Sequence, residues 1–216
     1  MISRRPRWGA TVILVALAVA IAAVFWVRKP ILRAAGGLLV ISEPVAPADI
    51  IVIAADSAGA GVLQAADLVH GGIATHVAVF ADPPSGEDLE FIRRGLPYED
   101  SAARQTRQLG WLGVKDVVQI DRDEAGSEGE SQILGPWCDR HGIRSVVFVA
   151  AKDHSRRIRR VLDRDMKGRT TRVTVQAERY STFDPDSWWQ TRTGIRSGIV
   201  ELQKLFLDIV THPISF

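Results

Sequence analysis

Short apolar runs alternate with amphipathic stretches through most of the chain. Five runs are nearly continuous in apolar, β-branched residues, which is typical of strands buried on both faces. They are Ile50–Ala54, His76–Phe80, Asp116–Ile120, Ser145–Ala150 and Thr171–Val175. Between and after them, apolar residues recur at helical spacing. This pattern predicts helices at Val62–His70, Tyr98–Gly110, Glu128–His141 and His154–Asp165, and one or two helices at Trp188–Val210.

Strands that alternate with helices require crossover connections. The pattern therefore predicts an α/β domain with a mostly parallel, five-stranded sheet covered on both faces. In such open sheets, ligands bind beyond the carboxyl ends of the strands. That rule selects three loops as candidate sites: Ala55–Gly61, Asp121–Glu130 and Ala151–Arg157.

The amino-terminal segment has a different pattern. Between Trp8 and Val27 there is no charge, and the run TVILVALAVAIAAVFWV is almost entirely aliphatic. Its length matches the ~20 residues that a helix needs to cross a bilayer. A cleaved signal peptide would have a shorter apolar run and a polar cleavage region, so we expect an uncleaved transmembrane helix. The resulting division is a tail at 1–8, an anchor at 9–27, a linker at 28–47 and a folded domain at 48–216.

The orientation of the anchor follows from its flanks. Basic residues are balanced in number on the two sides, but the short tail also carries the α-amino charge. The tail is therefore expected to stay in the cytoplasm. This makes the chain a single-pass protein of the cell membrane with an extracytoplasmic domain.

The net charge of +2 is mostly due to the segment around the predicted anchor. Six of the 27 Lys and Arg residues precede residue 34, so the remainder has 21 basic against 25 acidic side chains, a net charge of −4. A net acidic body argues against nucleic acid as a partner. The lone Cys138 excludes an intramolecular disulfide and a cysteine metal site.

The first loop, AADSAGAG, follows a strand and enters a helix. Small residues allow backbone amides to approach a phosphate or nucleotide at a helix N-terminus. Asp56, Ser57 and Gly59 are therefore candidate ligand-binding residues. A compact turn in which Asp56 or Ser57 caps the helix explains the same pattern equally well.

The second loop, DRDEAGSEGES, is acidic. Ser127 and Glu130 have the spacing of a capping box, which would give Glu130 a purely structural role. Alternatively, Glu128 or Glu130 projects into the crevice as a base or a hydroxyl-binding carboxylate. The clustered acidic residues could also hold a hard cation, although their spacing matches no known cation loop.

The third loop lies in VVFVAAKDHSRRIRR, Val146 to Arg160. His154 precedes Ile158 by four residues and so shares the buried face of the following helix, at its first turn above the sheet. Arg157 is near the same mouth, where a guanidinium can offer two donors to a carboxylate or phosphate. The other arginines of this basic segment are expected on the surface or in ion pairs: Arg159, Arg160, Arg164 and Arg169.

The order of these pieces resembles the YdcF/SanA/ElyC-like family, a bacterial family of poorly defined function. The matching pieces are Asp49 before IIVIA, then AADLVHGGIATHVAVF, the acidic Ser/Glu loop, a strand followed by His154-x-x-Arg157, and the tail DPDSWWQTRTGIRSGIVELQKL. They span residues 38 to 210, nearly the whole body.

The resemblance implies a Rossmann-like three-layer α/β/α sandwich, an envelope-associated role and, in one branch, binding of S-adenosylmethionine. By motif match it implies site residues at Asp49, Glu130, His154 and Arg157. Trp189, with the E-x-x-K pair Glu201 and Lys204, would support them.

Two departures from the family pattern concern ligand binding. The family has a run of glycines after the first strand, where this chain has Ala54 to Ser57. The added Cβ atoms and the Asp56 carboxylate change how an anion could approach. The usual Asn-Thr pair of the acidic loop is replaced by Glu128-Gly129.

Taken together, these patterns predict a membrane-anchored protein that binds or processes an anionic small molecule or lipid-linked headgroup, with a role in envelope integrity. In this hypothesis His154 and Glu130 are catalytic, and Arg157 clamps the anion. A non-catalytic module that recruits a ligand or partner is the alternative, because no nucleophile motif such as G-x-S-x-G is present. A cytoplasmic S-adenosylmethionine or nucleotide domain is a further alternative. Neither the substrate nor the oligomeric state follows from the sequence.

Overall fold

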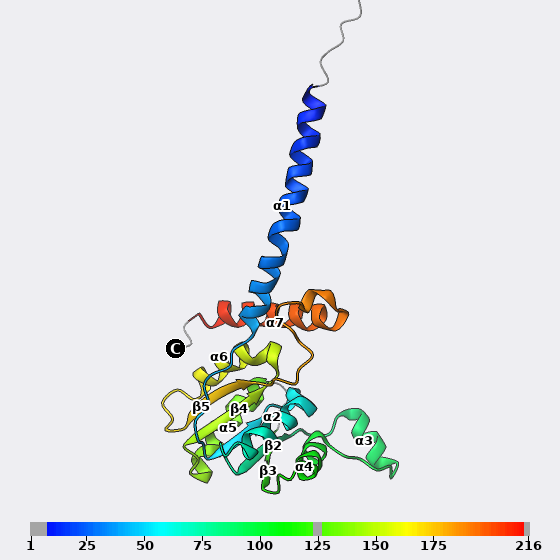
Figure 1. Ribbon diagram of the computed structural model, residues 1–216. Helices are drawn as coiled ribbons and strands as arrows, with labels where there is room; N and C mark the ends of the chain where they lie inside the picture. Colours follow the sequence, from blue (N-terminus) through cyan, green and yellow to red (C-terminus); the bar gives the residue numbers. More distant parts are fainter. Residues whose placement is uncertain (1–7, 123–126, 214–216) are drawn as a thin grey trace, which may run out of the picture.

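A five-stranded, parallel sheet forms the centre of the computed structural model, which describes residues 8–122 and 127–213 (Figure 1). The strands are β1 (Ile50–Ile53), β2 (His76–Ala81), β3 (Val117–Asp121), β4 (Ser145–Ala150) and β5 (Arg172–Ala177), in the spatial order β3-β2-β1-β4-β5. Each predicted strand agrees with the observed bounds to within two residues. The predicted parallel sheet is confirmed.

The strand order reverses at β1, which pairs with β2 on one side and β4 on the other. Ile53 has Val79 and Val149 as its partners in register, so the three strands run level toward their carboxyl ends. The chain leaves β1 and β4 in opposite directions at this topological switch point. A crevice at such a point is the usual place for a ligand in doubly wound folds.

Helices cover both faces of the sheet. The α-helices are α1 (Trp8–Leu39), α2 (Ala58–His70), α3 (Gly86–Arg93), α4 (Ser101–Trp111), α5 (Ser127–His141), α6 (Ser155–Asp165) and α7 (Arg192–Thr211), with the 3-10 turns η1 (Ala55–Ser57), η2 (Lys152–His154) and η3 (Trp188–Gln190). Ile51 and Ile53 pack with α2 and α4, and Ile50 and Val52 pack with α5 and α6. The three-layer α/β/α arrangement is confirmed, and burial of β1 on both sides explains its continuous apolar run.

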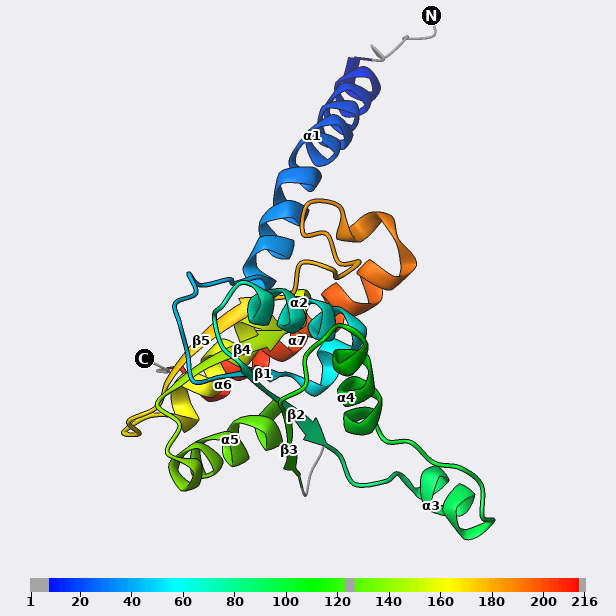
Figure 2. The same cartoon turned by 60° about the horizontal axis from the view of Figure 1, so that its bottom comes forward.

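A third core cluster joins the last turns of α1 to the carboxyl-terminal part of the chain. Leu39 at the end of α1 packs with Phe183, Trp188 and Leu205. The Trp188 indole Nε1 donates a hydrogen bond of 2.8 Å to the Leu32 carbonyl. These contacts attach the last turns of α1 to α7, and Figure 2 shows the two helices meeting on the same side of the body.

Two segments differ from the prediction. The predicted linker at 28–47 is helical as far as Leu39, and the helix continues through Pro30. Proline removes one backbone hydrogen bond, and the turns that follow Pro30 pack on Trp188 through Leu39 and its neighbours. The polar loop after β2 contains a helix, α3, which begins at a capping box formed by Ser85 and Asp88.

α1 projects away from the body (Figure 1). In the part of the chain that the structure describes, no helix has both the length and the apolar character needed to cross a membrane. The predicted anchor at 9–27 includes side chains outside that part, and nearly all of the predicted tail at 1–8 lies outside it. The anchor stays a prediction.

Candidate functional site

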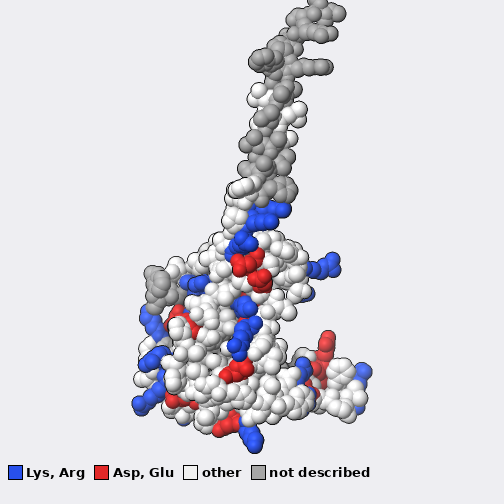
Figure 3. Space-filling model, viewed as in Figure 1, with Lys and Arg blue, Asp and Glu red and all other residues white. Residues whose placement is uncertain are grey.

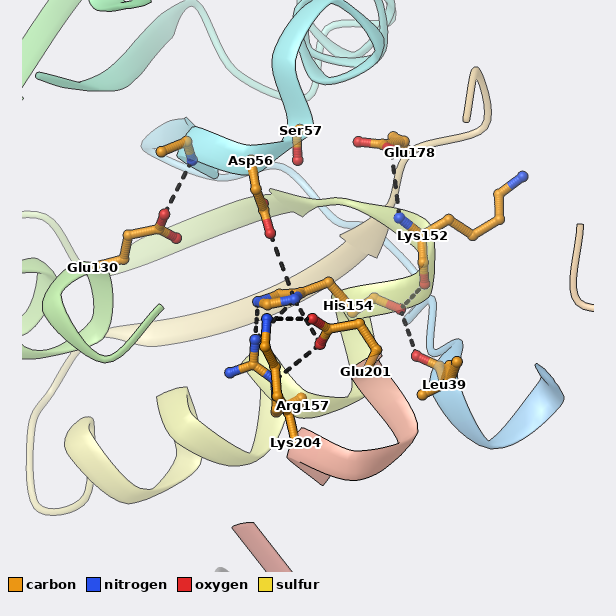
Figure 4. A network of polar contacts seen from close by, with 12 residues as sticks. Leu39, Asp56, Ser57, Glu130, Lys152, His154, Arg157, Glu178, Glu201 and Lys204 are labelled. Atoms are coloured by element: carbon orange, nitrogen blue, oxygen red, sulfur yellow. Dashed lines mark hydrogen bonds and ion pairs between the residues drawn. The ribbon is translucent and has the colours of Figure 1, made fainter. Parts of the chain in front are cut away.

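The loops after β1 and β4 bring the candidate side chains together at the switch point. Asp56 comes from η1, His154 from η2 and Arg157 from the first turn of α6. Glu201 of α7 completes the group from the opposite side (Figure 4). The sequence selected the first three by their position at strand ends. The structure confirms that these three lie close together.

Glu201 is at the centre of this network. Its Oε2 lies 2.9 Å from His154 Nδ1 and accepts a hydrogen bond of 3.0 Å from Arg157 Nε. Its Oε1 accepts a hydrogen bond of 2.7 Å from Lys204 Nζ. Burial alone would raise the pKa of Glu201, but His154, Lys204 and Arg157 outweigh it and lower the pKa to about 2. Glu201 is therefore ionised at neutral pH, where it pairs with Arg157 and Lys204.

His154 is held from three sides. Besides Glu201, Asp56 Oδ2 lies 3.5 Å from Nδ1, and a terminal nitrogen of Arg157 lies 2.9 Å from Nδ1 and 2.8 Å from Nε2. The ring is buried, with 7% of the side chain exposed. Ile158, predicted on the same buried face of the helix as His154, is also buried, and so are Val161, Leu162 and Met166.

Glu130 lies beside the loop after β1, where it binds backbone and arginine donors. Its Oε1 accepts hydrogen bonds from the Ala55 backbone N–H at 3.1 Å and from Arg122 at 3.2 Å, and Arg122 also pairs with Asp82. The carboxyl group thus fixes the loop after β1 through the Ala55 backbone. Burial, reinforced by the nearby Asp56 charge, raises the pKa of Glu130 to about 7. These contacts with η1 and Arg122 position the loop after β1, and the catalytic role of Glu130 stays a prediction.

Glu178 was missed by the sequence analysis. It follows β5 directly, and its Oε1 accepts a hydrogen bond of 3.4 Å from the Lys152 backbone N–H in η2. Burial raises the pKa of Glu178 to about 7, against the opposing effect of the Ser57 hydroxyl. The strand-end rule would have identified this residue had it been applied to the fifth strand.

A groove of about 470 Å³ opens beside this network. Asp56 and His154 line it together with Thr193, Arg196 and Ser197 of α7. A neighbouring cavity of about 370 Å³ shares Asp153, Thr193 and Ser197 with the groove and adds three hydroxyl side chains: Ser181, Thr182 and Thr191. The combined lining includes hydroxyl groups and side chains of both signs of charge.

Asp49 does not join the other candidates. It precedes β1, at the opposite edge of the sheet from His154. Its Oδ2 accepts hydrogen bonds of 2.8 and 2.9 Å from the backbone N–H groups of Arg144 and Ser145, and these bonds lower the pKa of Asp49. Its contacts tie the starts of β1 and β4 together.

Two other candidate residues, Ser57 and Trp189, make contacts that stabilise the fold. The Ser57 hydroxyl is buried and donates to the Val149 carbonyl at 3.2 Å, tying η1 to β4. Trp189 packs edge-on against Trp188, with ring centroids 6.3 Å apart, in the cluster that joins α1 to α7. Gly59 and Glu128 are exposed, and the side chain of Ser127 lies outside the described part.

The remaining arginines of the basic segment behave as predicted. Arg160 and Arg164 both pair with Asp208 of α7. Arg159 pairs with Asp163, and Arg169 with Asp139. All four of these arginines are therefore in ion pairs. For the acidic loop, residues 123–126 lie outside the description, and the described residues contain no cluster that could hold a metal ion.

The loop after β1 is strained at one position. Ala58 has φ +44° and ψ −138°, and it is the one non-glycine residue with positive φ among those described. A side chain with a Cβ rarely adopts such a conformation, and its cost is of order 1–3 kcal/mol. This strain lies two residues from Asp56, at the start of α2.

The fold and the site define a doubly wound, parallel α/β protein with a His–Glu–Arg network at the switch point of its sheet. No family model matches the chain, and no curated protein is significantly similar to it. The resemblance to the YdcF/SanA/ElyC-like family therefore stays a prediction that rests on its motifs.

Proposed function

We propose that this is a membrane-anchored, envelope-associated protein that binds an anionic, hydroxyl-bearing small molecule or lipid-linked headgroup in the groove beside His154. One observation supports this more than any other. Asp56, His154 and Arg196 line a single groove at the switch point, although they come from three separate elements. Convergence of this kind at that point is the usual mark of a ligand site.

The chemistry of the lining indicates the kind of ligand. Arg196 is exposed and provides a guanidinium for a phosphate or carboxylate. Asp56 and Asp153 offer carboxylate oxygens, which accept hydrogen bonds from hydroxyl groups, and Thr193 and Ser197 add hydroxyls. Arg157 was predicted to clamp the anion, but it is occupied by Glu201 and His154. We therefore assign anion binding to Arg196.

The anchor and location are part of the proposal. The uncharged run from Trp8 to Val27 has the length of a membrane span, and helix α1 includes all of it. The short basic tail favours a domain outside the cytoplasm. The role in envelope integrity follows from the family resemblance.

A reaction, if the protein catalyses one, would use His154. The ionised Glu201 orients the imidazole through Nδ1, as a carboxylate does in many acid–base pairs. Asp56 faces the same ring and is 43% exposed, so it can contact both the ring and a ligand. These groups suit proton transfer to or from a bound hydroxyl or phosphate.

Binding of glycerol 3-phosphate and of inorganic phosphate to the full chain in nanodiscs tests the proposal by calorimetry. We expect His154→Ala and Arg196→Ala each to weaken binding of glycerol 3-phosphate about 10-fold or more, the usual loss for a charged hydrogen bond. Arg172→Ala is the matched control, because Arg172 is exposed at the opposite edge of the sheet. Equal affinity in all four proteins would remove both residues from the site.

A binding module without catalysis is the second candidate. The observation that favours it is the position of the Arg157 guanidinium, within 2.9 Å of both ring nitrogens of His154. A nitrogen at nearly equal distance from both lies against the ring, and it takes space there that a reacting group would need. Complementation of a strain that lacks the gene separates the two candidates. A His154→Gln protein that binds ligand and fully restores envelope integrity would support the binding module and contradict catalysis.

The nucleotide alternative has less support from the described loops. The phosphates of a nucleotide would bind at the start of α2, away from Arg196, and the Asp56 carboxylate in η1 would repel them there. S-adenosylmethionine carries no phosphate, and its binding stays a prediction.

A further inference from the structure

Helix α7 carries an apolar stripe on its outer surface. Ile195, Ile199, Leu202, Phe206 and Ile209 are spaced by four, three, four and three residues, so they lie along one face of the helix. Four of them are between 40% and 64% exposed, and Leu202 is half-buried against the end of α1. Val210 extends the stripe and is 59% exposed.

The stripe is not needed to hold α7 in place. Its other face is the buried one, formed by Gly194, Gly198, Glu201 and Leu205. Those residues pack against Trp188 and bind His154 and Arg157. The exposed face is therefore available to something outside the described chain. An exposed apolar row of this length marks an interaction surface.

The position of α7 indicates what covers the stripe. α7 lies crosswise at the base of α1, and both views agree on this (Figures 1 and 2). The exposed side chains of α1 near the junction include three apolar ones, Val27, Ile31 and Leu38. Two apolar surfaces thus meet at one level of the molecule, one from each helix.

Basic side chains surround this level. Lys29, Arg33, Arg192 and Arg196 are all exposed there. Figure 3 shows Lys and Arg side chains around the junction between α1 and the body, with Asp and Glu side chains among them, and Arg33 lies 3.9 Å from Asp186. An amphipathic helix with apolar residues on one face and cations beside them is typical of helices that lie in the membrane interface. Cations next to the surface are attracted to anionic lipids.

We propose that α7 lies in the plane of the membrane interface, with its apolar stripe at the boundary between headgroups and acyl chains. This inference rests on the proposed anchor, because it uses the same bilayer that α1 would enter. Thr193, Arg196 and Ser197 of α7 line the groove beside His154, so the groove would open at headgroup level. The ligand class that this favours is a lipid headgroup presented by the membrane itself.

Fluorescent probes on single cysteines test the arrangement in the full chain. The native Cys138 is buried, which raises the pKa of its thiol to about 12 and keeps it unreactive toward labelling. The probe is attached to Ile199→Cys or Phe206→Cys in vesicles of phosphatidylglycerol and phosphatidylcholine. Leu17→Cys reports on α1, and Phe91→Cys on the exposed face of α3 is the control far from α1 (Figure 1). Thermal unfolding verifies that each labelled protein is folded.

Lipids with a nitroxide either near the headgroup end or near the methyl end of the acyl chain then quench the probes. We expect about two-fold quenching at 199 and 206 by the shallow nitroxide, since interfacial helices bury ~5–10 Å into this layer. Position 17 is near the middle of the predicted span, so we expect quenching there by the deep nitroxide, and none at 91 by either. Quenching at 17 with none at 199 and 206 would overturn the position of α7 and leave the anchor proposal intact. No quenching at any of the four positions would overturn both. Probes at 199 and 206 that are protected from water, unquenched by lipid and close to a second chain would assign the stripe to a dimer and overturn the inference.

Discussion

His154 Nδ1 and Glu201 Oε2 lie 2.9 Å apart, and this contact connects the loop after β4 to the carboxyl-terminal helix. The contact links His154 to α7, the helix that also packs on the end of α1. A change in the position of α7 would therefore reach His154 through the Glu201 carboxylate, which also pairs with Arg157 and Lys204.

Replacing Glu201 by glutamine should destabilise the protein in a pH-dependent way. The folded pKa of about 2 lies below the ordinary value of 4.5, so the carboxylate stabilises the fold fully above pH 4.5 and loses this effect as pH falls toward 2. We expect Glu201→Gln to lower the free energy of unfolding by about 2–3 kcal/mol at pH 7, with the difference shrinking below pH 4. Denaturant unfolding from pH 2.5 to 8 measures it. Glu128→Gln, at an exposed position, should match the wild type, and a Glu201→Gln deficit that is constant across this range would contradict the prediction.

Glu178 should have the opposite dependence on pH. Its folded pKa of about 7 lies above 4.5, so the folded state holds a proton that the unfolded state releases, and stability falls as pH rises from 4.5 to 7. Glu178→Gln removes this titration. We expect the stability of the variant relative to wild type to increase by about 2–3 kcal/mol between pH 4.5 and pH 8, as judged by chemical denaturation. Glu87→Gln on exposed α3 is the control, and a flat difference between Glu178→Gln and wild type would show that Glu178 does not titrate in this window.

The sheet was predictable because its strands are buried on both faces. Burial of this kind produces apolar runs such as IIVI in β1, which need no knowledge of distant residues. The extent of α1 was not predictable in the same way. Its last turns depend on Trp188, whose indole binds the Leu32 carbonyl from 156 positions away. Helix α3 did have a local sign in Ser85 and Asp88, but it buries none of its residues, so no apolar periodicity marked it.

The site was predictable where position in the sheet decides it. His154 and Asp56 follow central strands, and the carboxyl ends of those strands meet at one edge. Glu201 lies within a helix, and its contact with His154 depends on how α7 packs, which spacing alone does not determine. Glu130 has the spacing of a capping box, and its carboxylate also binds Ala55 from another loop. Spacing along the chain does not show tertiary hydrogen bonds of this kind.

Relief of strain at Ala58 should stabilise the protein. With φ at +44°, this residue is in a region where glycine has no steric cost. We expect Ala58→Gly to raise the free energy of unfolding by about 1 kcal/mol. Ala60→Gly, two residues later in the regular part of α2, should lower it by about 1 kcal/mol. Thermal unfolding of the two variants compares them directly, and a loss of stability in both would mean that Ala58 is not strained.

The attachment of α7 depends on glycines that face Trp188. A Cβ on Gly198 would come within 2.5 Å of the Trp188 ring, too close for any real contact. We expect Gly198→Ala to cost about 1–3 kcal/mol, because the indole must move away from the end of α1. Gly110→Ala in α4 is the matched control, since a Cβ there meets nothing within 4 Å and a helical alanine stabilises by up to about 1 kcal/mol. Because Trp188 also holds Leu32, Gly198→Ala should loosen α1 first, which hydrogen exchange at residues 32–39 would detect as faster exchange than in the body. Unchanged protection at 32–39 together with unchanged stability would show that Trp188 does not couple the two helices.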